Sequence, residues 1–153
     1  MIELRSAKLK DAKEVLLLQR LAFQPLLNHY QDFKTNPAME SLEKIKEKLT
    51  QEETFFYYIK KESTTLGMIR VVDFRNKQAK RVAPVFILPA YQNQGFAQKA
   101  FQLIEESHGS YHWQLSTIKE EKGNCHLYEK LGYRQTGSEL VVNEKMTIVY
   151  YTK

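Results

Sequence analysis

Cysteine is nearly absent from this chain of 153 residues, because Cys125 is the only one. A single cysteine excludes an internal disulfide and any zinc site built on several cysteine ligands. No apolar run approaches the roughly 20 residues that a membrane-spanning helix needs. The first residues, MIELRSAKLKDAKEV, also lack the apolar core of a signal peptide. We therefore expect a cytoplasmic protein with no membrane association.

Blocks of one charge are absent as well. The formal net charge is +5 and the pI is about 9.2, but lysine and glutamate are interleaved, as in ESLEKIKEKL. This pattern disfavours a dedicated nucleic-acid surface, although the basic balance is compatible with a phosphorylated small ligand. The four histidines have neither the spacing nor the neighbours of a metal site, so no metal is expected.

Repeats, low-complexity stretches and linkers rich in proline, glycine or serine are also missing. Apolar residues make up 42% of the chain and charged residues 27%, so residues 1–153 are expected to form one globular domain. Hydrophobic periodicity predicts a mixed α/β sheet with the order β-α-α-β-β-β-α-β-α-β-β, which a strictly alternating parallel fold would not show. The predicted strands are residues 2–6, 54–60, 64–74, 81–88, 111–118, 133–142 and 145–153. Four helices are predicted: the first begins after Asp11, the second runs from about Met39 to Thr50, the third begins after Gly95, and the fourth covers residues 123–132.

Two prolines bear on these elements. Asp11, with Glu14 three residues later, resembles a capping box, and the first helix is expected to stop before Pro25. Residues 26–38 are then predicted to form a loop. Pro84 lies within a predicted strand, which indicates either a bulge or an edge position there.

The most informative segment is VFILPAYQNQGFAQKAFQLI, residues 85–104, in which a buried strand ends at Leu88 and Gly95 opens a helix. A helix start presents unpaired N–H groups and the positive end of the helix dipole, which together bind anions. Gly95 lets a bulky anion approach the backbone, and Ala97 keeps a nearby position small. An ordinary strand–loop–helix joint, whose glycine only relieves a turn, explains the same residues.

The segment QNQGFA, residues 92–97, resembles the Q/R-x-x-G-x-G/A pattern of the GNAT superfamily of acetyl-CoA-dependent N-acetyltransferases. The resemblance implies a GNAT-type fold, with acetyl-CoA as the acetyl donor and no metal. It implies that N–H groups of the loop hold the CoA pyrophosphate. It also implies that the pantetheine arm pairs with the preceding strand, in a gap between residues 81–88 and 111–118. The implied cofactor-binding residues are Phe86, Ile87, Leu88, Gln92, Asn93, Gln94, Gly95, Phe96, Ala97, Gln98 and Asn124.

A second segment, GNCHLYEKLGYRQTG, residues 123–137, is similar to a helix-then-strand element of that family. Tyr128 lies where many members carry a tyrosine facing the CoA sulfur, so the resemblance implies a catalytic role. A phenol, with a pKa near ~10, can donate a hydrogen bond or a proton to the thiolate of a thiol with a pKa near ~8.5. Alternatively, Tyr128 is a packed aromatic beside Leu127 and Leu131. Its place one position from that stripe predicts that its hydroxyl points away from the core.

Two features depart from the family pattern. Glu121 stands where many members have an asparagine, and Asn124 is the residue that could reach the pantetheine instead. The strand KRVAPVFIL, residues 80–88, has no carboxylate, although many members place a general base there, so the base is unassigned. Backbone N–H groups near Leu88 are expected to polarise the thioester.

The loop HYQDFKTNPAMES, residues 29–41, shows neither helical nor strand periodicity, and long irregular loops in small domains are often functional. The resemblance implies that the first two helices and this loop cover the acceptor site. Tyr30 and Asp32 are therefore predicted to contact the acceptor, an amine on a small molecule or peptide. The final hairpin offers an edge that could pair in a homodimer.

The sequence thus predicts an N-acetyltransferase in which a neutral primary amine attacks acetyl-CoA directly, and a ping-pong route through Cys125 is the minor option. Two rivals stay open. A CoA-binding regulatory module without catalysis is favoured by the missing carboxylate and opposed by Tyr128. A basic nucleic-acid-binding protein is supported only by the pI.

Overall fold

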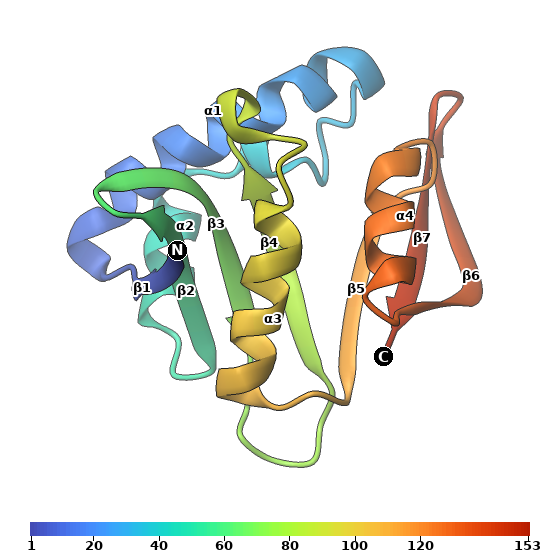
Figure 1. Cartoon of the computed structure of the whole chain (residues 1–153). Coiled ribbons are helices and arrows are strands. Elements are labelled where there is room, and N and C mark those ends of the chain that lie inside the picture. The colour runs from blue at the N-terminus through green and yellow to red at the C-terminus, as the bar shows by residue number, and fades with distance from the viewer.

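The computed structural model describes every residue from Met1 to Lys153. The elements follow the predicted order, and the predicted mixed α/β fold class is confirmed (Figure 1). The strands are β1 (Ile2–Ser6), β2 (Thr54–Lys61), β3 (Thr64–Val72), β4 (Lys80–Ile87), β5 (Trp113–Ile118), β6 (Arg134–Asn143) and β7 (Met146–Thr152). The helices are α1 (Ala12–Tyr30), α2 (Leu42–Thr50), α3 (Phe96–His108) and α4 (Lys122–Lys130), with 3-10 turns η1 (Leu9–Asp11), η2 (Pro37–Met39) and η3 (Pro89–Tyr91).

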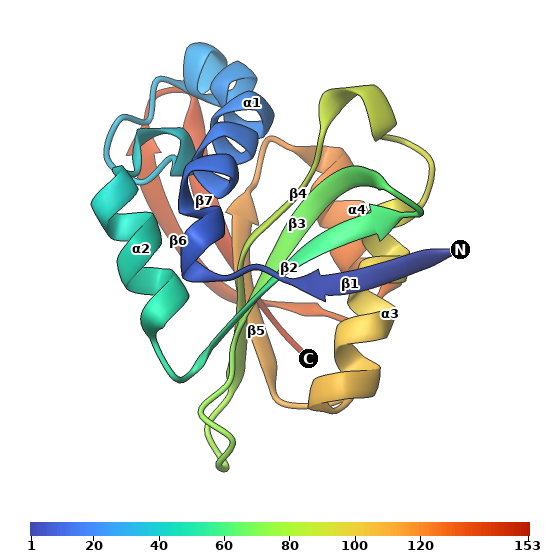
Figure 2. The same cartoon turned by 90° about the vertical axis from the view of Figure 1, so that its left-hand side faces the viewer.

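All strands belong to one sheet, in the order β1-β2-β3-β4-β5-β7-β6, and only β4 and β5 are parallel neighbours. Helices α1 and α2 cover one face of the sheet, and α3 and α4 cover the other (Figure 2). Each face has its own hydrophobic cluster, one containing Phe101 and Trp113 and the other containing Ile45 and Phe86. None of these helices combines the length and the apolar character that crossing a membrane requires.

The sheet splits between β4 and β5. Only two residue pairs join these strands, formed by Lys80 and Arg81 at the start of β4. Immediately afterwards the β3–β4 register shifts, because residues 82–85 of β4 contain one residue more than the facing part of β3. Pro84 lies in this bulge and has no N–H to donate, so the bulge predicted there is confirmed, and the strand is not at an edge. Figure 1 shows β4 and β5 diverging from their shared end.

Helix α1 is longer than the sequence predicted, because it continues through Pro25 to Tyr30. The prediction that it stops before Pro25 is therefore wrong, as is the loop predicted for residues 26–30. Pro25 removes one backbone hydrogen bond, but its side chain is exposed, while Leu27 and Tyr30 in the last turn are buried. Burial of that turn outweighs the lost bond. The helix ends at Gln31, which has a φ of 56°.

Helix α1 begins after Asp11, as predicted, but without the predicted side-chain cap, and α2 begins later than predicted. The side chain of Asp11 does not cap α1; its carboxylate instead accepts a hydrogen bond from the Lys8 N–H, 2.9 Å away, within η1. Helix α2 begins after Ser41 and not at Met39. The Ser41 hydroxyl accepts a hydrogen bond from the Lys44 N–H at 3.1 Å, and this cap fixes the start of the helix.

Candidate active site

The loop between β4 and α3 carries the predicted anion site. Gly95 is the N-cap of α3 and is left-handed, with φ 80° and ψ 10°. A Cβ atom there would meet no heavy atom within 4 Å, so the backbone conformation, and not a lack of space, requires glycine. The start of α3 therefore faces open space.

The N–H groups at the end of this loop and at the start of α3 have no partners along the backbone. Residues 93–95 donate to no carbonyl, and the first turn of α3, residues 96–98, has no preceding helical turn that supplies acceptors. A run of free N–H groups at the positive end of a 13-residue helix can bind an anion. Lys61, at the end of β2, lies beside this loop, with its Nζ 5.9 Å from the ring centre of Phe96. Sequence reasoning missed Lys61, because nothing local connects the end of β2 with α3.

Strand β4 presents alternate residues to the gap. The Leu88 N–H donates to the Leu66 carbonyl at 2.8 Å, so it is not free to polarise a thioester. By the alternation of an antiparallel ladder, the N–H groups of Val85 and Ile87 point away from β3 toward the gap. Consistent with this, the carbonyl of Ile87 accepts from Gln92 Nε2 at 3.0 Å. The N–H groups of Val85 and Ile87, and not that of Leu88, are therefore the donors available near this end of β4.

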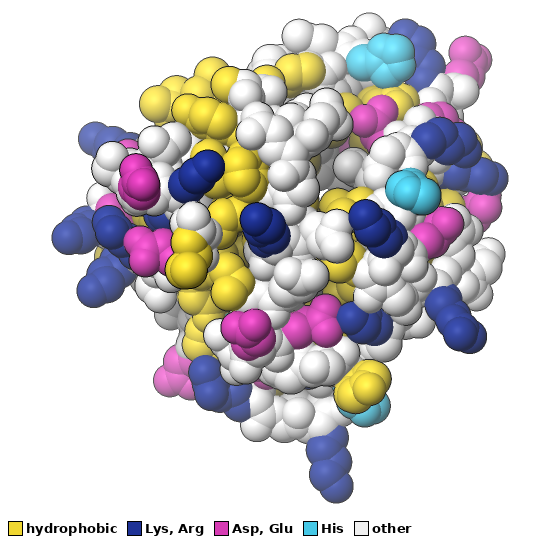
Figure 3. Space-filling model, viewed as in Figure 1, with side chains coloured by type: hydrophobic (Ala, Val, Ile, Leu, Met, Phe, Trp, Pro, Cys, Tyr) yellow, Lys and Arg dark blue, Asp and Glu magenta, His cyan; other side chains and the backbone are white.

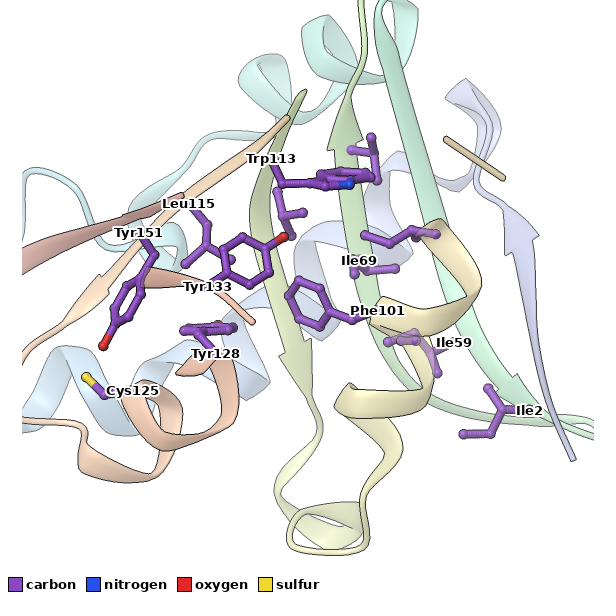
Figure 4. Close-up of a cluster of buried hydrophobic side chains, with 14 of the residues drawn as sticks. Ile2, Ile59, Ile69, Phe101, Trp113, Leu115, Cys125, Tyr128, Tyr133 and Tyr151 are labelled. Atoms are coloured by element: carbon purple, nitrogen blue, oxygen red, sulfur yellow. The ribbon is translucent and has the colours of Figure 1, made fainter. Parts of the chain in front are cut away.

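The ring of Tyr128 is part of the core. The residue is 6% exposed and packs edge-on against Phe101 and Tyr133, with ring-centre distances of 5.7 and 6.1 Å (Figure 4). Leu127 and Leu131, in contrast, are only half-buried at the edge of this cluster. The argument that Tyr128 lies off the packing stripe is therefore wrong, because Tyr128 is itself the more deeply buried residue.

The hydroxyl of Tyr128 nevertheless has different surroundings from that of Tyr151. Tyr128 lines a large cavity, and its hydroxyl makes no hydrogen bond to the protein, whereas the Tyr151 hydroxyl donates to Glu129 at 2.7 Å. Burial raises the pKa of Tyr128 well above its usual value, and the nearby Cys125 adds to the effect. Tyr128 therefore stays protonated at neutral pH and can act only as a donor to a developing negative charge.

This cavity has a volume of about 780 Å³ and lies on the side of α1 and α2. It extends from the loop after α1, past the bulge of β4, to β5, β7 and Tyr128. Asn124, predicted to contact the pantetheine, lines it as well, whereas residues 86–98 do not. The predicted anion-binding loop and the cavity therefore share no lining residue, whereas Tyr128 belongs to the cavity wall.

The two predicted acceptor contacts have different surroundings. Tyr30 is 4% exposed and does not line the cavity, and its hydroxyl donates to Glu121 Oε2 at 2.5 Å. Asn143 Nδ2 donates to its carbonyl at 2.8 Å, so Tyr30 ties the end of α1 to the start of α4 and to the final hairpin. Burial, and then the Glu121 carboxylate, raise the pKa of Tyr30 above its usual value. Contact between Tyr30 and an acceptor stays a prediction.

Asp32, in contrast, lines the cavity although it is only 3% exposed. Its carboxylate accepts hydrogen bonds from the N–H groups of Lys34 and Thr35, at 3.2 and 3.1 Å, and from the Thr35 hydroxyl. The side chain therefore fixes the turn that forms one wall. Contact of Asp32 with an acceptor amine stays a prediction as well.

The remaining carboxylate in the cavity is Glu40. It lies 2.6 Å from Lys48 Nζ and accepts from Gln19 Nε2 at 2.7 Å. Both carboxylates of the cavity are thus held by protein groups, and β4 carries none. No residue emerges as a free general base. No group of three or more histidine, cysteine, aspartate or glutamate residues is arranged to hold a metal ion.

Comparison with known proteins places this geometry in a family. The model of the acetyltransferase (GNAT) domain matches residues 26–152. No curated protein matches the chain. Among solved structures, spermidine N-acetyltransferase from Vibrio cholerae, in complex with CoA and spermine, superposes with a TM-score of 0.76 at 15% identity, covering 98% of this chain and 93% of that one.

Two further structures are similar over comparable lengths. PaiA N-acetyltransferase from Thermoplasma acidophilum, in complex with coenzyme A, has a TM-score of 0.73 at 13% identity and covers 100% of this chain and 99% of its own. Ribosomal-protein-S18-alanine N-acetyltransferase from Escherichia coli also has a TM-score of 0.73 at 13% identity, with 99% and 92% covered. At such identities the superpositions support the fold, and the domain match identifies the family. The chain belongs to the GNAT family of acetyltransferases and is an acyltransferase with acetyl-CoA as its acetyl donor.

Proposed function

We propose that this chain transfers the acetyl group of acetyl-CoA to a primary amine by direct attack. The observation that carries the proposal is the position of Tyr128, which is buried, protonated and without a protein partner for its hydroxyl, at the cavity wall beside the β4–β5 gap. A donor whose pyrophosphate binds at the start of α3, and whose arm follows β4, would bring its thioester to this gap.

The chemistry then follows from the groups present. The amine nitrogen attacks the thioester carbonyl carbon, the C–S bond breaks, and its electron pair leaves on sulfur. The N–H groups of Val85 and Ile87 point toward the gap and are our candidates for polarising the carbonyl. Tyr128 donates a hydrogen bond or a proton to the departing thiolate. The proton of the amine passes to solvent, because Asp32 and Glu40 are engaged.

A second candidate is a regulatory module that binds CoA without turnover. It is favoured by one observation, the absence of a free carboxylate in the cavity and on β4. A nucleic-acid-binding function gains no support from the face of the molecule that Figure 3 shows. On the face that carries α3 and α4, basic and acidic side chains are interspersed (Figure 3). A cytoplasmic location and a homodimer stay predictions from the sequence.

The test pairs binding with turnover. Calorimetry with CoA measures donor binding, and a thiol-reactive dye measures CoA release from acetyl-CoA with a panel of amines. We expect binding and amine-dependent release, with N-acetylated product identified by mass spectrometry. CoA binding without release for any amine would favour the regulatory module. Lack of CoA binding would refute the assignment of the α3 start.

A further inference from the structure

The cavity is unevenly charged. Lys44 and Lys48, one helical turn apart on α2, both line it, and Arg81 at the start of β4 and Lys34 from the loop after α1 do so as well. Only two carboxylates, Asp32 and Glu40, line the same cavity. The wall therefore has a surplus of positive charge.

Both carboxylates are already bound to groups of the protein. Glu40 pairs with Lys48 at 2.6 Å, and Asp32 accepts from its own turn. Lys34 and Arg81 form no ion pair, and the Lys44 pair with Glu47 is long, at 3.9 Å, and exposed. These three cations are the ones left to meet a ligand.

A buried arginine adds to the positive charge beneath the wall. Arg70 is 8% exposed, and its Nη1 donates to the carbonyl of Ala83, a residue of the cavity, at 2.8 Å. It forms no ion pair, and its buried Nε has no partner. Burial is the main cause that lowers the pKa of Lys48; the hydrogen bond and charge of Glu40 raise it, and the charges of Arg70 and Lys44 lower it. The cations are thus close enough to repel one another.

Other parts of the lining are apolar. Side chains from α1, the following loop and the final hairpin form them, and several are exposed, among them Phe33 at 61% and Leu140 at 49%. A ligand in the cavity would therefore meet both cations and apolar groups. The wall offers no free carboxylate to hold a second ammonium group.

Resting on the proposed function, we propose that the acceptor is an amine that also carries an anionic group, a carboxylate or a phosphate, which binds the cations of α2 and β4. A polyamine would carry additional positive charge into this field. The same field disfavours the ammonium form of the reacting amine and so lowers its pKa. This effect supplies neutral nucleophile without a carboxylate base, which the cavity does not offer.

Matched acceptors test the proposal. The first pair is glycyl-phenylalanine and its C-terminal amide, the second is O-phosphoethanolamine and ethanolamine, and spermidine is the polyamine. We expect kcat/KM for at least one anionic member to exceed that of its neutral counterpart by about tenfold or more, and the pair that shows the difference identifies the group. A neutral member or spermidine acetylated as well as the anionic ones would overturn the proposal and leave the proposed function intact.

Two variants locate the effect. Lys44→Gln with Arg81→Gln should reduce the preference for the anionic member, which is the ratio of its kcat/KM to that of its neutral counterpart, by about tenfold. Lys46→Gln, an exposed lysine on the same helix that does not line the cavity, is the control and should change neither value. Equal effects of both changes would overturn the proposal. If CoA binds but no amine is acetylated, the proposed function fails, and this inference fails with it.

Discussion

Replacing Tyr128 with phenylalanine is the most direct test of the active site. The change removes one oxygen and keeps the ring, which packs against Phe101 and Tyr133. Because the hydroxyl makes no hydrogen bond within the protein, no internal bond is lost. We expect the free energy of unfolding to change by less than about 1 kcal/mol. The variant therefore separates chemistry from folding.

The expected loss is confined to the chemical step. A positioned proton donor contributes about 10²–10⁴-fold, so kcat should fall by that factor, equivalent to about 2.7–5.4 kcal/mol of activation free energy. Binding of acetyl-CoA should change little, because the α3 start and β4 are untouched. If product release limits the wild type, the loss in kcat is smaller than the loss in the single-turnover rate.

Tyr133→Phe is the matched control. Tyr133 is a neighbouring buried tyrosine whose hydroxyl also lacks a partner, but it does not line the cavity. We expect it to keep the full rate. Single-turnover CoA release, followed with a thiol dye, is measured for both variants from pH 6 to 10. A Tyr128→Phe enzyme that matches the wild type throughout this range would show that Tyr128 is only a core aromatic.

Four further outcomes follow from the geometry. Gly95→Glu should raise the Kd for CoA about 100-fold by placing a negative charge at the α3 start, while Gly137→Glu, at another open glycine of positive φ, should not; equal Kd values by calorimetry would remove the phosphate-loop assignment. Gly67→Ala should lower the free energy of unfolding by about 1–3 kcal/mol, because its Cβ would lie 2.0 Å from the Phe86 carbonyl oxygen; an unchanged urea midpoint would contradict that contact. Asp32→Ala should raise the acceptor KM by about fivefold or more and leave CoA affinity unchanged, and a fall in CoA affinity instead would place the acceptor elsewhere. The contribution of five tyrosines to stability should be constant up to about pH 10 and fall above it in urea titrations, since folding raises tyrosine pKa values and the unfolded chain releases those protons first; the groups concerned are Tyr30, Tyr58, Tyr128, Tyr133 and Tyr151.

The order of elements could be predicted because its signals are local. Alternation marks the strands, and glycine at residues 95 and 132 marks a helix start and a helix end, both with positive φ in the structure. The loop that ends at Gly95 could be predicted for the same reason, because its signals are also local in the sequence. Pro25 misled the prediction, because the missing N–H is a local cost, whereas the burial of Leu27 and Tyr30 that outweighs it comes from distant packing.

The cavity could not be predicted, because its walls come from segments far apart in the chain. The sequence pattern of Lys44 and Lys48 is typical of a solvated helix face, and only the folded chain shows that they line the same cavity as Arg81. Glu121 was noticed as a departure from the family pattern, but its partner Tyr30 lies 91 positions away. No periodicity connects such residues, so their contact emerges only from the packing of α1 against the C-terminal half.

The split sheet has a consequence for how this molecule can be stabilised. The N–H groups of Val85 and Ile87 have no ladder partner on the β5 side, so the free protein keeps an incomplete sheet in its centre. Hydrogen exchange at these amides should therefore be fast without acetyl-CoA and slow with it. A sequence change that let β4 and β5 pair along their whole length would add backbone hydrogen bonds between them. It would also close the gap in which the substrate is proposed to bind. Selection for thermal stability alone would consequently work against activity here.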